Sequence, residues 1–424
     1  MAYNVLSSEA LSRVIRAGDS RRFGVNLKKD RSAILSGAAD EALRTAPQLA
    51  PFMSTKIRGK LCVSYQRYND HLIIRSIARY LRRRLRISVP DRHKTSIGVI
   101  QALADSTPMY LLRRDISSFY ESLDVEKIKD RVLYDTTTAP RVRAYLRHFF
   151  DQHCAQSGAG IPRGIGLSAL LSELYMQDFD KRVRELPGVY RYFRYADDIL
   201  IFSTVPNREL DPALLRCLPN GMRFNSRKAA NLALGEASRT TKPVHFEYLG
   251  YRYNIATSSK KESARTISLG IAKTKISRLK SRVILTTKEF GRTGDFSLFY
   301  DRMRFLTSNY EVRRNGVAYS GAATHVRSGI YYSYLHCGTY TVSPSRAITK
   351  AEWDAHELRS LDGFFRAIAF GASSRLAAQI RPRLSALQIT LLKELSFHAG
   401  YQSRMMVRLQ PHEVADIKAV WRHV

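Results

Sequence analysis

The spacing of apolar residues predicts helices in the N-terminal quarter of the chain. From Ser8 to about Ala50 the apolar positions follow a helical period, and a short β-rich stretch is expected around Lys56 to Tyr65. Between Asp70 and Ile87, leucine and isoleucine recur at intervals of three and four residues while arginines fill the gaps. This pattern is typical of an amphipathic helix with one packed and one charged face. A further short helix is expected from Ser96 to Leu103.

The centre of the chain predicts strands that alternate with helices. The segment MYLLRRDIS reads as a strand with Asp115 at its C-terminal end, and Asp124 is placed to cap the helix that follows. A long helix is predicted from Gly164 to Arg184. Two strands folded around Ala196-Asp197-Asp198 are predicted from Val189 to Ser203, which makes this hairpin the clearest local element of the sequence.

Short strand elements follow the hairpin, and the last third of the chain is predicted to be mostly helical. Short elements are expected around Met222 to Asn225, followed by a strand from His245 to Tyr253. Beyond about Ser258 the apolar spacing is mostly helical. Together these elements predict an α+β fold followed by a helical C-terminal region.

Composition and charge narrow the class of protein. A chain of 424 residues is long enough for two or three compact units. Lysine and arginine number 69 against 37 acidic residues, and the resulting charge of +32 favours a nucleic-acid partner. No apolar stretch is long enough to cross a bilayer, and the four cysteines lack the spacing of a zinc site or a disulfide framework. We therefore expect no membrane association and a reducing cytoplasm.

Three aspartates at predicted strand ends are the main candidates for chemistry. Asp115 ends one strand, and Asp197 and Asp198 lie at the turn of the hairpin. Phosphodiester synthesis uses two divalent cations about 3.5–4 Å apart, for which carboxylates are suitable hard ligands. An Asp-Asp pair in a hairpin is also common in a solvated turn. Here, however, the flanking segments RYFRY and ILIF are apolar strands, where adjacent acids would repel each other without a cation.

Three segments resemble motifs of reverse transcriptases. YRYFRYADDILIF, which starts at Tyr190, resembles their YADD hairpin, and LLRRDISSFYESLD, which starts at Leu111, resembles the motif that supplies the other metal-binding aspartate. GIPRGIGLSALLSELYMQDFD, which starts at Gly160, resembles their Pro-x-Gly turn and the helix after it. Weaker similarities occur in FNSRKAANL and FEYLGYRY, so the resemblance extends from about Arg67 to Tyr253.

The resemblance implies a right-hand polymerase. Residues 1–107 would form the fingers and an N-terminal helical region, and residues 108–256 the palm with part of the fingers inserted. Residues 257–424 would form a helical thumb and a C-terminal extension that binds RNA. The implied cofactor is a pair of Mg²⁺ ions, with Mn²⁺ as the alternative. The implied metal-binding residues are Asp115, Ile116, Asp197 and Asp198, and the three aspartates are also the implied catalytic residues.

The same resemblance implies residues that contact the incoming nucleotide. Tyr120 would lie under the sugar and exclude a 2′-hydroxyl, unless it is a core aromatic like its neighbour Phe119. Arg163 departs from the family pattern, because it stands where many relatives have a glutamine that contacts nucleotide or template. The other implied substrate-binding residues are Gly164 in the Pro-x-Gly turn, Lys228 as a proton donor to pyrophosphate, and Lys60 as a triphosphate-binding residue in the fingers.

Two further regions have the composition of nucleic-acid contacts. The segment RYLRRRLR, from Arg79 to Arg86, holds five arginines in eight residues, and on so basic a chain we favour contacts with phosphates over a merely solvated face. The C-terminal third mixes basic and aromatic residues as single-stranded RNA binders do. Its tyrosines are equally suited to stacking on bases and to packing in a core; they include Tyr310, Tyr331, Tyr332 and Tyr334.

Within the reverse transcriptases, the chain resembles the defence-associated bacterial enzymes of the unknown group. That resemblance implies antiphage defence, a noncoding RNA that serves as template, dNTPs as substrates and a cDNA product. The alternatives are a retron-type enzyme, which usually has sequence elements that this chain lacks, and an RNA-binding protein that retains the polymerase fold without catalysis. An RNA-templated RNA polymerase is disfavoured by Tyr120, and a two-metal nuclease does not explain the Pro-x-Gly helix.

Overall fold

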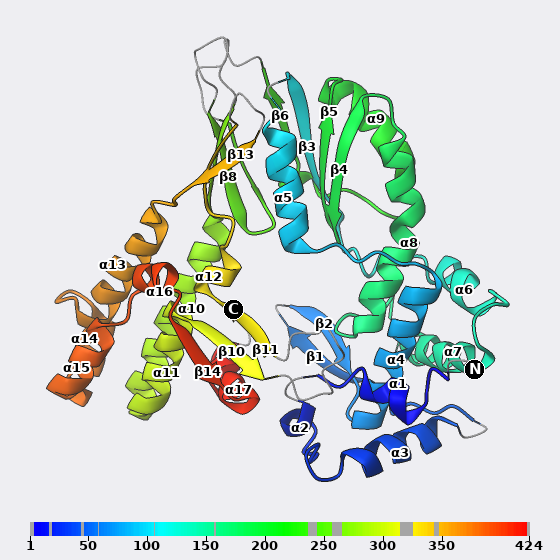
Figure 1. Cartoon of the computed structure of the whole chain (residues 1–424), viewed down its shortest axis with the longest axis horizontal. Helices are drawn as coiled ribbons and strands as arrows, with labels where there is room; N and C mark the ends of the chain where they lie inside the picture. Colours follow the sequence, from blue (N-terminus) through cyan, green and yellow to red (C-terminus); the bar gives the residue numbers. More distant parts are fainter. Residues whose placement is uncertain are drawn as a thin grey trace. The chain divides into compact units, whose positions relative to one another are not determined.

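The computed structural model describes residues 4–16, 19–43, 46–57, 59–105, 107–156, 158–235, 244–256, 265–313, 325–342 and 347–421. Its contacts divide the chain into two compact units (Figure 1). The N-terminal unit consists mainly of residues 1–102 and 107–236, and the C-terminal unit mainly of residues 237–314 and 321–424. All the candidate catalytic and substrate-binding residues belong to the N-terminal unit.

The N-terminal unit packs helices around a four-stranded sheet whose strand order is β4-β5-β3-β6. Its helices are α1 (Ser8–Ser12), α2 (Asp19–Arg22), α3 (Arg31–Ala42), α4 (Tyr68–Arg84), α5 (Arg92–Leu103), α6 (Val125–Leu133), α7 (Pro140–Ala155), α8 (Gly166–Arg184) and α9 (Asn207–Cys217). The strands are β1 (Met53–Ile57), β2 (Lys60–Ser64), β3 (Met109–Asp115), β4 (Val189–Tyr195), β5 (Asp198–Ser203) and β6 (Ala230–Leu234). Strands β1 and β2 form a separate hairpin.

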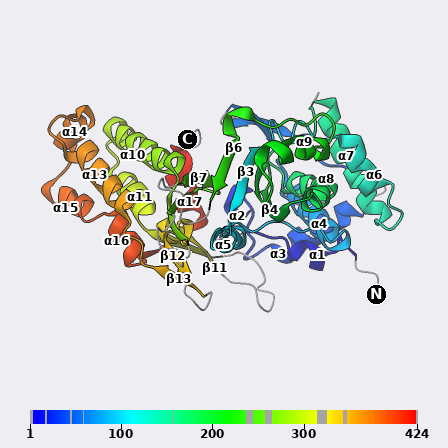
Figure 2. The ribbon, with the colours of Figure 1, turned by 90° about the horizontal axis from the view of Figure 1, so that it is seen from above.

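The two faces of the four-stranded sheet are covered by different helices (Figure 2). Tyr192 and Arg194 of β4 bond to side chains of α8, so they lie on one face of the sheet. Phe193 points to the opposite face, where its ring contacts Gly98 of α5. Because successive strand side chains alternate between faces, β4 separates a helix α8 side from a helix α5 side. Strand β5 is buried from Ile199 to Ser203 and forms the centre of this core.

The C-terminal unit contains both helices and sheets. Its strands are β7 (Val244–Tyr248), β8 (Tyr251–Ala256), β9 (Thr266–Ile271), β10 (Asn309–Arg313), β11 (His325–Gly329), β12 (Gly338–Val342), β13 (Ile348–Ala351) and β14 (Met406–Leu409). Its helices are α10 (Lys273–Thr293), α11 (Phe296–Thr307), α12 (Ile330–Ser333), α13 (His356–Phe370), α14 (Arg375–Ile380), α15 (Ala386–Lys393), α16 (Phe397–Gln402) and α17 (Pro411–Ala419). The strand orders are β13-β12-β9-β8-β7 and β11-β10-β14.

The structure confirms the α+β class and adds strands to the C-terminal third. The predicted helices and the central hairpin are present, and Asp124 caps α6 by accepting from two main-chain N–H groups. The strand predicted from His245 to Tyr253 is instead a hairpin, because Leu249 and Gly250 both take positive φ angles, of +49° and +82°, at the turn. The mostly helical prediction beyond Ser258 missed the strands from β9 onward, which are only four to six residues long.

The four cysteines are free thiols. Within the described ranges, no helix combines the length and the apolar character that crossing a bilayer requires.

Candidate active site

The three candidate aspartates meet at one end of the four-stranded sheet. Asp115 is the last residue of β3 and pairs directly with Asp198, the first residue of β5. Ala196 and Asp197 form the two-residue turn between β4 and β5, and Ala196 takes a φ of +54° that few non-glycine residues adopt. The main-chain N–H of Ile116 donates to the Asp197 carbonyl over 3.0 Å, which fixes the turn against the end of β3.

The side chains of the three aspartates are wholly or partly buried. Asp115 is only 4% exposed. Burial raises the pKa of Asp197, and the charge of Asp115 adds to this increase. Burial also raises the pKa of Asp198, although hydrogen bonds from Arg113 oppose it. Mutual repulsion between neighbouring carboxylates is the electrostatic feature expected of a site that attracts cations.

Basic side chains form ion pairs with two of these carboxylates. The Arg113 guanidinium donates to both oxygens of Asp198, over 3.0 and 3.1 Å. The Lys228 Nζ lies 2.6 Å from Asp115 Oδ1, and the Asn225 amide donates to Asp115 Oδ2 over 3.4 Å. With these pairings, no three acidic, histidine or cysteine side chains of the described residues are grouped closely enough to hold a metal ion. The donor chemistry nevertheless suits a hard cation, because the available ligands are carboxylate oxygens.

Ile116 can contribute to such a site only through its main chain. Its side chain is aliphatic and 1% exposed, so it belongs to the core between β3 and the helices. The carbonyl oxygen is therefore the one ligand that this residue offers.

Tyr120 follows a strained turn that separates it from Asp115. Ser118 has a φ of +46°, and Phe119 is buried in the core, whereas the Tyr120 ring is only partly buried. Burial raises the pKa of Tyr120, while a hydrogen bond with Ser172 opposes the shift and the charge of Asp197 adds to it. The structure thus separates the two aromatics: Phe119 is a core residue, and Tyr120 lies within electrostatic reach of Asp197.

The Pro-x-Gly turn joins Tyr120 to the β1–β2 hairpin. Arg163 forms a bidentate ion pair with Glu121, at 2.6 and 2.7 Å, and its guanidinium lies 4.8 Å from the centre of the Tyr120 ring. The Arg163 carbonyl also accepts the main-chain N–H of Val63 in β2 over 2.7 Å. Arg163 therefore holds the turn and Tyr120 together, a role that the sequence alone did not indicate.

Gly164 and Lys60 also lie in this neighbourhood. Gly164 has a φ of +99°, and a Cβ atom there would lie 2.5 Å from the carbonyl oxygen of Val63. Lys60 is the exposed first residue of β2, and its positive charge acts on both Asp197 and Glu121. The β1–β2 hairpin therefore brings a lysine toward the aspartates.

Replacing Gly164 with alanine is expected to destabilise the protein by about 1–3 kcal/mol. The added Cβ would be strained at a positive φ and would also press on Val63 of β2. The free energy of unfolding, measured in urea, checks this. The control is Gly221→Ala, because Gly221 has a φ of +84° and open space around it. Equal destabilisation by both changes would contradict a specific role for the Gly164–Val63 approach.

The sequence analysis missed a buried ion network beneath the Asp197 turn. Arg194 of β4 is 7% exposed and forms ion pairs with Glu173 and Asp180 of α8, each at 2.7 Å. Arg194 also donates to the carbonyl of Ala196 over 3.1 Å. The only sequence signal was the alternation of two arginines with aromatic residues in this strand, near a helix that carries two acids.

Comparisons with known proteins identify the domain that carries this site. Residues 59–253 match the family model "Reverse transcriptase (RNA-dependent DNA polymerase)". No curated protein matches the chain. Solved structures that resemble it include a telomerase from Candida tropicalis, at 12% identity and a TM-score of 0.32, and a telomerase from Candida albicans with a fragment of telomeric RNA, at 13% identity and a TM-score of 0.34.

These structural similarities are limited in extent. The first covers 54% of this chain and 56% of the telomerase chain, and the second covers 93% and 66%. The assignment therefore depends on the family match, which includes all three aspartates and the Pro-x-Gly turn. Residues 59–253 form a reverse transcriptase domain, the domain of an RNA-directed DNA polymerase and hence of a nucleotidyltransferase.

Proposed function

We propose that the protein synthesises cDNA on a partner noncoding RNA, in the bacterial cytoplasm, as part of antiphage defence. The observation that carries the polymerase activity is the direct pairing of Asp115 with Asp198 beside the Asp197 turn, within a reverse transcriptase domain. The charge of +32 supports a stable polyanionic partner. The defence role is supported only by the sequence resemblance described above.

Asp115, Asp197 and Asp198, with the carbonyl oxygen of Ile116, are the residues that would hold two divalent ions, Mg²⁺ or alternatively Mn²⁺. Such ions activate the attacking hydroxyl and neutralise the departing pyrophosphate. Neighbouring basic side chains balance the charge of these carboxylates. Arg113 and Lys228 neutralise Asp198 and Asp115 when no cation is present, which lets three acids share one sheet edge in the folded chain.

The remaining candidates receive roles that fit their positions. Lys228 is the proton donor to pyrophosphate, because its Nζ lies beside Asp115 on a side chain that is 52% exposed. Lys60 attracts the triphosphate from the β1–β2 hairpin. Arg163 orients Tyr120 through its stacking contact, and Gly164 allows β2 to approach the turn.

The regions of the chain follow the same proposal. Residues 1–107 act as fingers and N-terminal region, residues 108–256 as palm, and residues 257–424 as thumb and RNA-binding extension. The boundary between the compact units lies near residue 236, before the β7–β8 hairpin.

Replacing Tyr120 with alanine is expected to lower the preference for dNTPs over rNTPs by roughly 10- to 200-fold, the range by which a pocket discriminates one group of methylene size. The ring lies near Asp197, where it would meet a 2′-hydroxyl. Single-nucleotide incorporation of each dNTP and rNTP measures the ratio. Tyr120→Phe retains the ring and should retain the preference. An unchanged ratio in the alanine variant would eliminate Tyr120 as the discriminator.

The proposed function is tested with protein purified from its native host. The RNA that copurifies is sequenced, and labelled dNTPs and Mg²⁺ are added to wild type and to a variant with Asp197→Ala and Asp198→Ala. Labelled DNA complementary to a single bound RNA, absent in the variant, supports the proposal and names the template. A tightly bound RNA without dNTP incorporation under any primer favours the non-catalytic RNA binder.

A further inference from the structure

Helix α4 presents an unusually basic surface on a rigid support. Its apolar face is fully buried, since Ile73, Ile77 and Leu81 are all 0% exposed in the core of the N-terminal unit. The hydroxyl of Tyr80 accepts the main-chain N–H of Ala139 over 3.1 Å, which ties the outer side of the helix to the start of α7. The arginines of this segment therefore project from a fixed helix.

Four arginines of this segment converge on one cavity. The cavity has a volume of about 410 Å³ and is lined by Ser76, Arg79, Tyr80, Arg83, Arg84 and Arg86. These positions follow the helical period along one face and continue to Arg86, two residues beyond the end of the helix. We call these six residues the α4 arginine groove.

The groove lacks the acidic partners that arginines have elsewhere in the unit. Among the described residues, no carboxylate lies within ion-pair distance of its four arginines, and Arg79 Nε is buried without a hydrogen-bond partner. By contrast, Arg75 of the same helix pairs with Asp19 at 2.6 Å. Arginines four residues apart, such as Arg79 and Arg83, repel each other. The helix dipole favours a basic last turn but does not explain this convergence.

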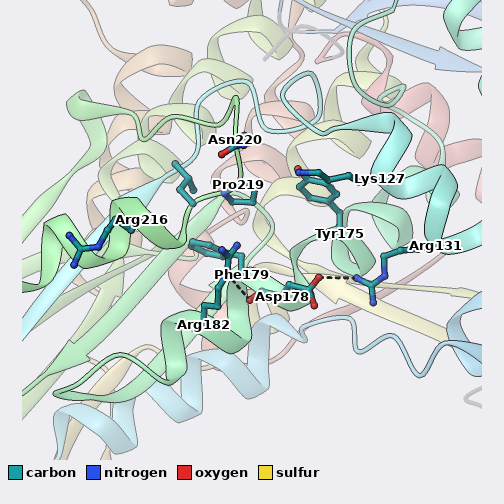
Figure 3. Close-up of a pocket in the computed structure, with 10 residues that line it drawn as sticks. Lys127, Arg131, Tyr175, Asp178, Phe179, Arg182, Arg216, Pro219 and Asn220 are labelled. Atoms are coloured by element: carbon teal, nitrogen blue, oxygen red, sulfur yellow. Dashed lines mark hydrogen bonds and ion pairs between the residues drawn. The ribbon is translucent and has the colours of Figure 1, made fainter.

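A second basic cavity of the same unit differs from the groove because its basic side chains have acidic partners. It has a volume of about 280 Å³ and is lined by residues that include Lys127, Arg131, Asp178, Arg182 and Arg216 (Figure 3). There the Asp178 carboxylate lies 3.8 Å from Arg131, and Lys127 pairs with Asp124 at 3.7 Å. The second cavity thus has ion-paired carboxylates at its lining, whereas the described lining of the α4 arginine groove has none, and Asp135, on which the charge of Arg84 acts, lies beyond ion-pair distance.

We propose that the α4 arginine groove binds the phosphodiester backbone of a nucleic acid at a place separate from the candidate active site. The seven residue steps from Arg79 to Arg86 span about 10 Å at the helical rise, which is the axial length of about three nucleotides of one strand. Guanidinium groups bind phosphate oxygens in bidentate fashion. An anionic membrane is a poorer occupant, because the apolar face of α4 is already buried in the core. The inference concerns binding and goes beyond the proposed polymerase activity.

The test compares two triple variants that remove the same charge from the full chain. One carries Arg83→Gln, Arg84→Gln and Arg86→Gln in the groove, and the other carries Lys127→Gln, Arg182→Gln and Arg216→Gln in the second cavity. Affinities for a labelled RNA hairpin, a DNA hairpin of the same sequence and vesicles of anionic lipid are measured without dNTPs over a range of salt concentrations. Binding is therefore scored independently of whether the protein polymerises DNA.

The groove variant should bind the RNA hairpin about tenfold more weakly or worse, because each lost phosphate contact removes a charge-assisted hydrogen bond. The slope of log affinity against log salt should fall by about 2–3, against less than about 1 for the control. A parallel loss for the DNA hairpin supports recognition of the backbone itself. Equal losses in both variants, an unchanged groove variant, or a loss confined to the vesicles would overturn the proposal.

Discussion

Replacing Asp197 with asparagine is expected to reduce dNTP incorporation by about a thousandfold or more. A bound divalent ion contributes several kcal/mol to the stabilisation of transition-state charge, and each 1.36 kcal/mol corresponds to a factor of ten in rate. Asp197 occupies the turn between β4 and β5, and it is electrostatically coupled to Asp115. The amide is nearly the same size as the carboxyl group but lacks the charge that the ions require. Steady-state incorporation on a primed RNA template measures the loss.

The same substitution should leave the fold intact or stabilise it. Burial and the charge of Asp115 raise the pKa of Asp197, so ionised Asp197 is costly in the folded chain. Asparagine removes that repulsion, and the midpoint of urea unfolding should stay level or rise. Asp178→Asn is the control, because Asp178 is an acid of the same unit whose side chain is 79% exposed. An Asp197→Asn protein with activity within tenfold of wild type would contradict the assignment.

The elements that the sequence predicted well are those specified by neighbouring residues. The β4–β5 hairpin has apolar strands on both sides of a two-residue turn, so local alternation was enough to locate it. Asp124 was recognisable as a helix cap for the same reason. The placement of Tyr120 and Arg163 near these aspartates came instead from the family resemblance, because no local pattern encodes it.

The features that the sequence did not reveal depend on pairing between distant residues. Lys228 lies 113 positions after Asp115, and nothing in either segment indicates their 2.6 Å contact. Strand β14 pairs with β10 through Asn309 and Met406, which are 97 positions apart. Such short strands have too few residues for a visible period and form because a partner edge is available. The Arg113–Asp198 pair was closer to being predictable, since Arg113 precedes Asp115 by two residues and so shares its face of β3.

Replacing Arg194 with leucine is expected to destabilise the N-terminal unit by about 3–5 kcal/mol, the usual cost of removing one partner of a buried ion pair. The guanidinium donates to both oxygens of Glu173, to both oxygens of Asp180 and to the carbonyl of Ala196. These bonds use all five of its N–H groups. Without the arginine, two carboxylates would be left without compensation in the core. Urea unfolding measures the loss, with Arg191→Leu as the control because Arg191 is an exposed arginine of the same strand.

A combined variant separates the contribution of Arg194 to stability from its contribution to positioning. Adding Glu173→Gln and Asp180→Asn to Arg194→Leu removes the uncompensated charges, so much of the lost stability should return. The Ala196 carbonyl would still lack its donor, and the turn that carries Asp197 would be held less firmly. We therefore expect dNTP incorporation to remain at least about tenfold below wild type in the restabilised variant, because small displacements of catalytic groups are costly. Full recovery of activity together with stability would show that the network supports only the fold. Persistent loss of activity in the restabilised variant would show that Arg194, buried on the α8 side of β4, fixes the geometry of the candidate metal-binding turn.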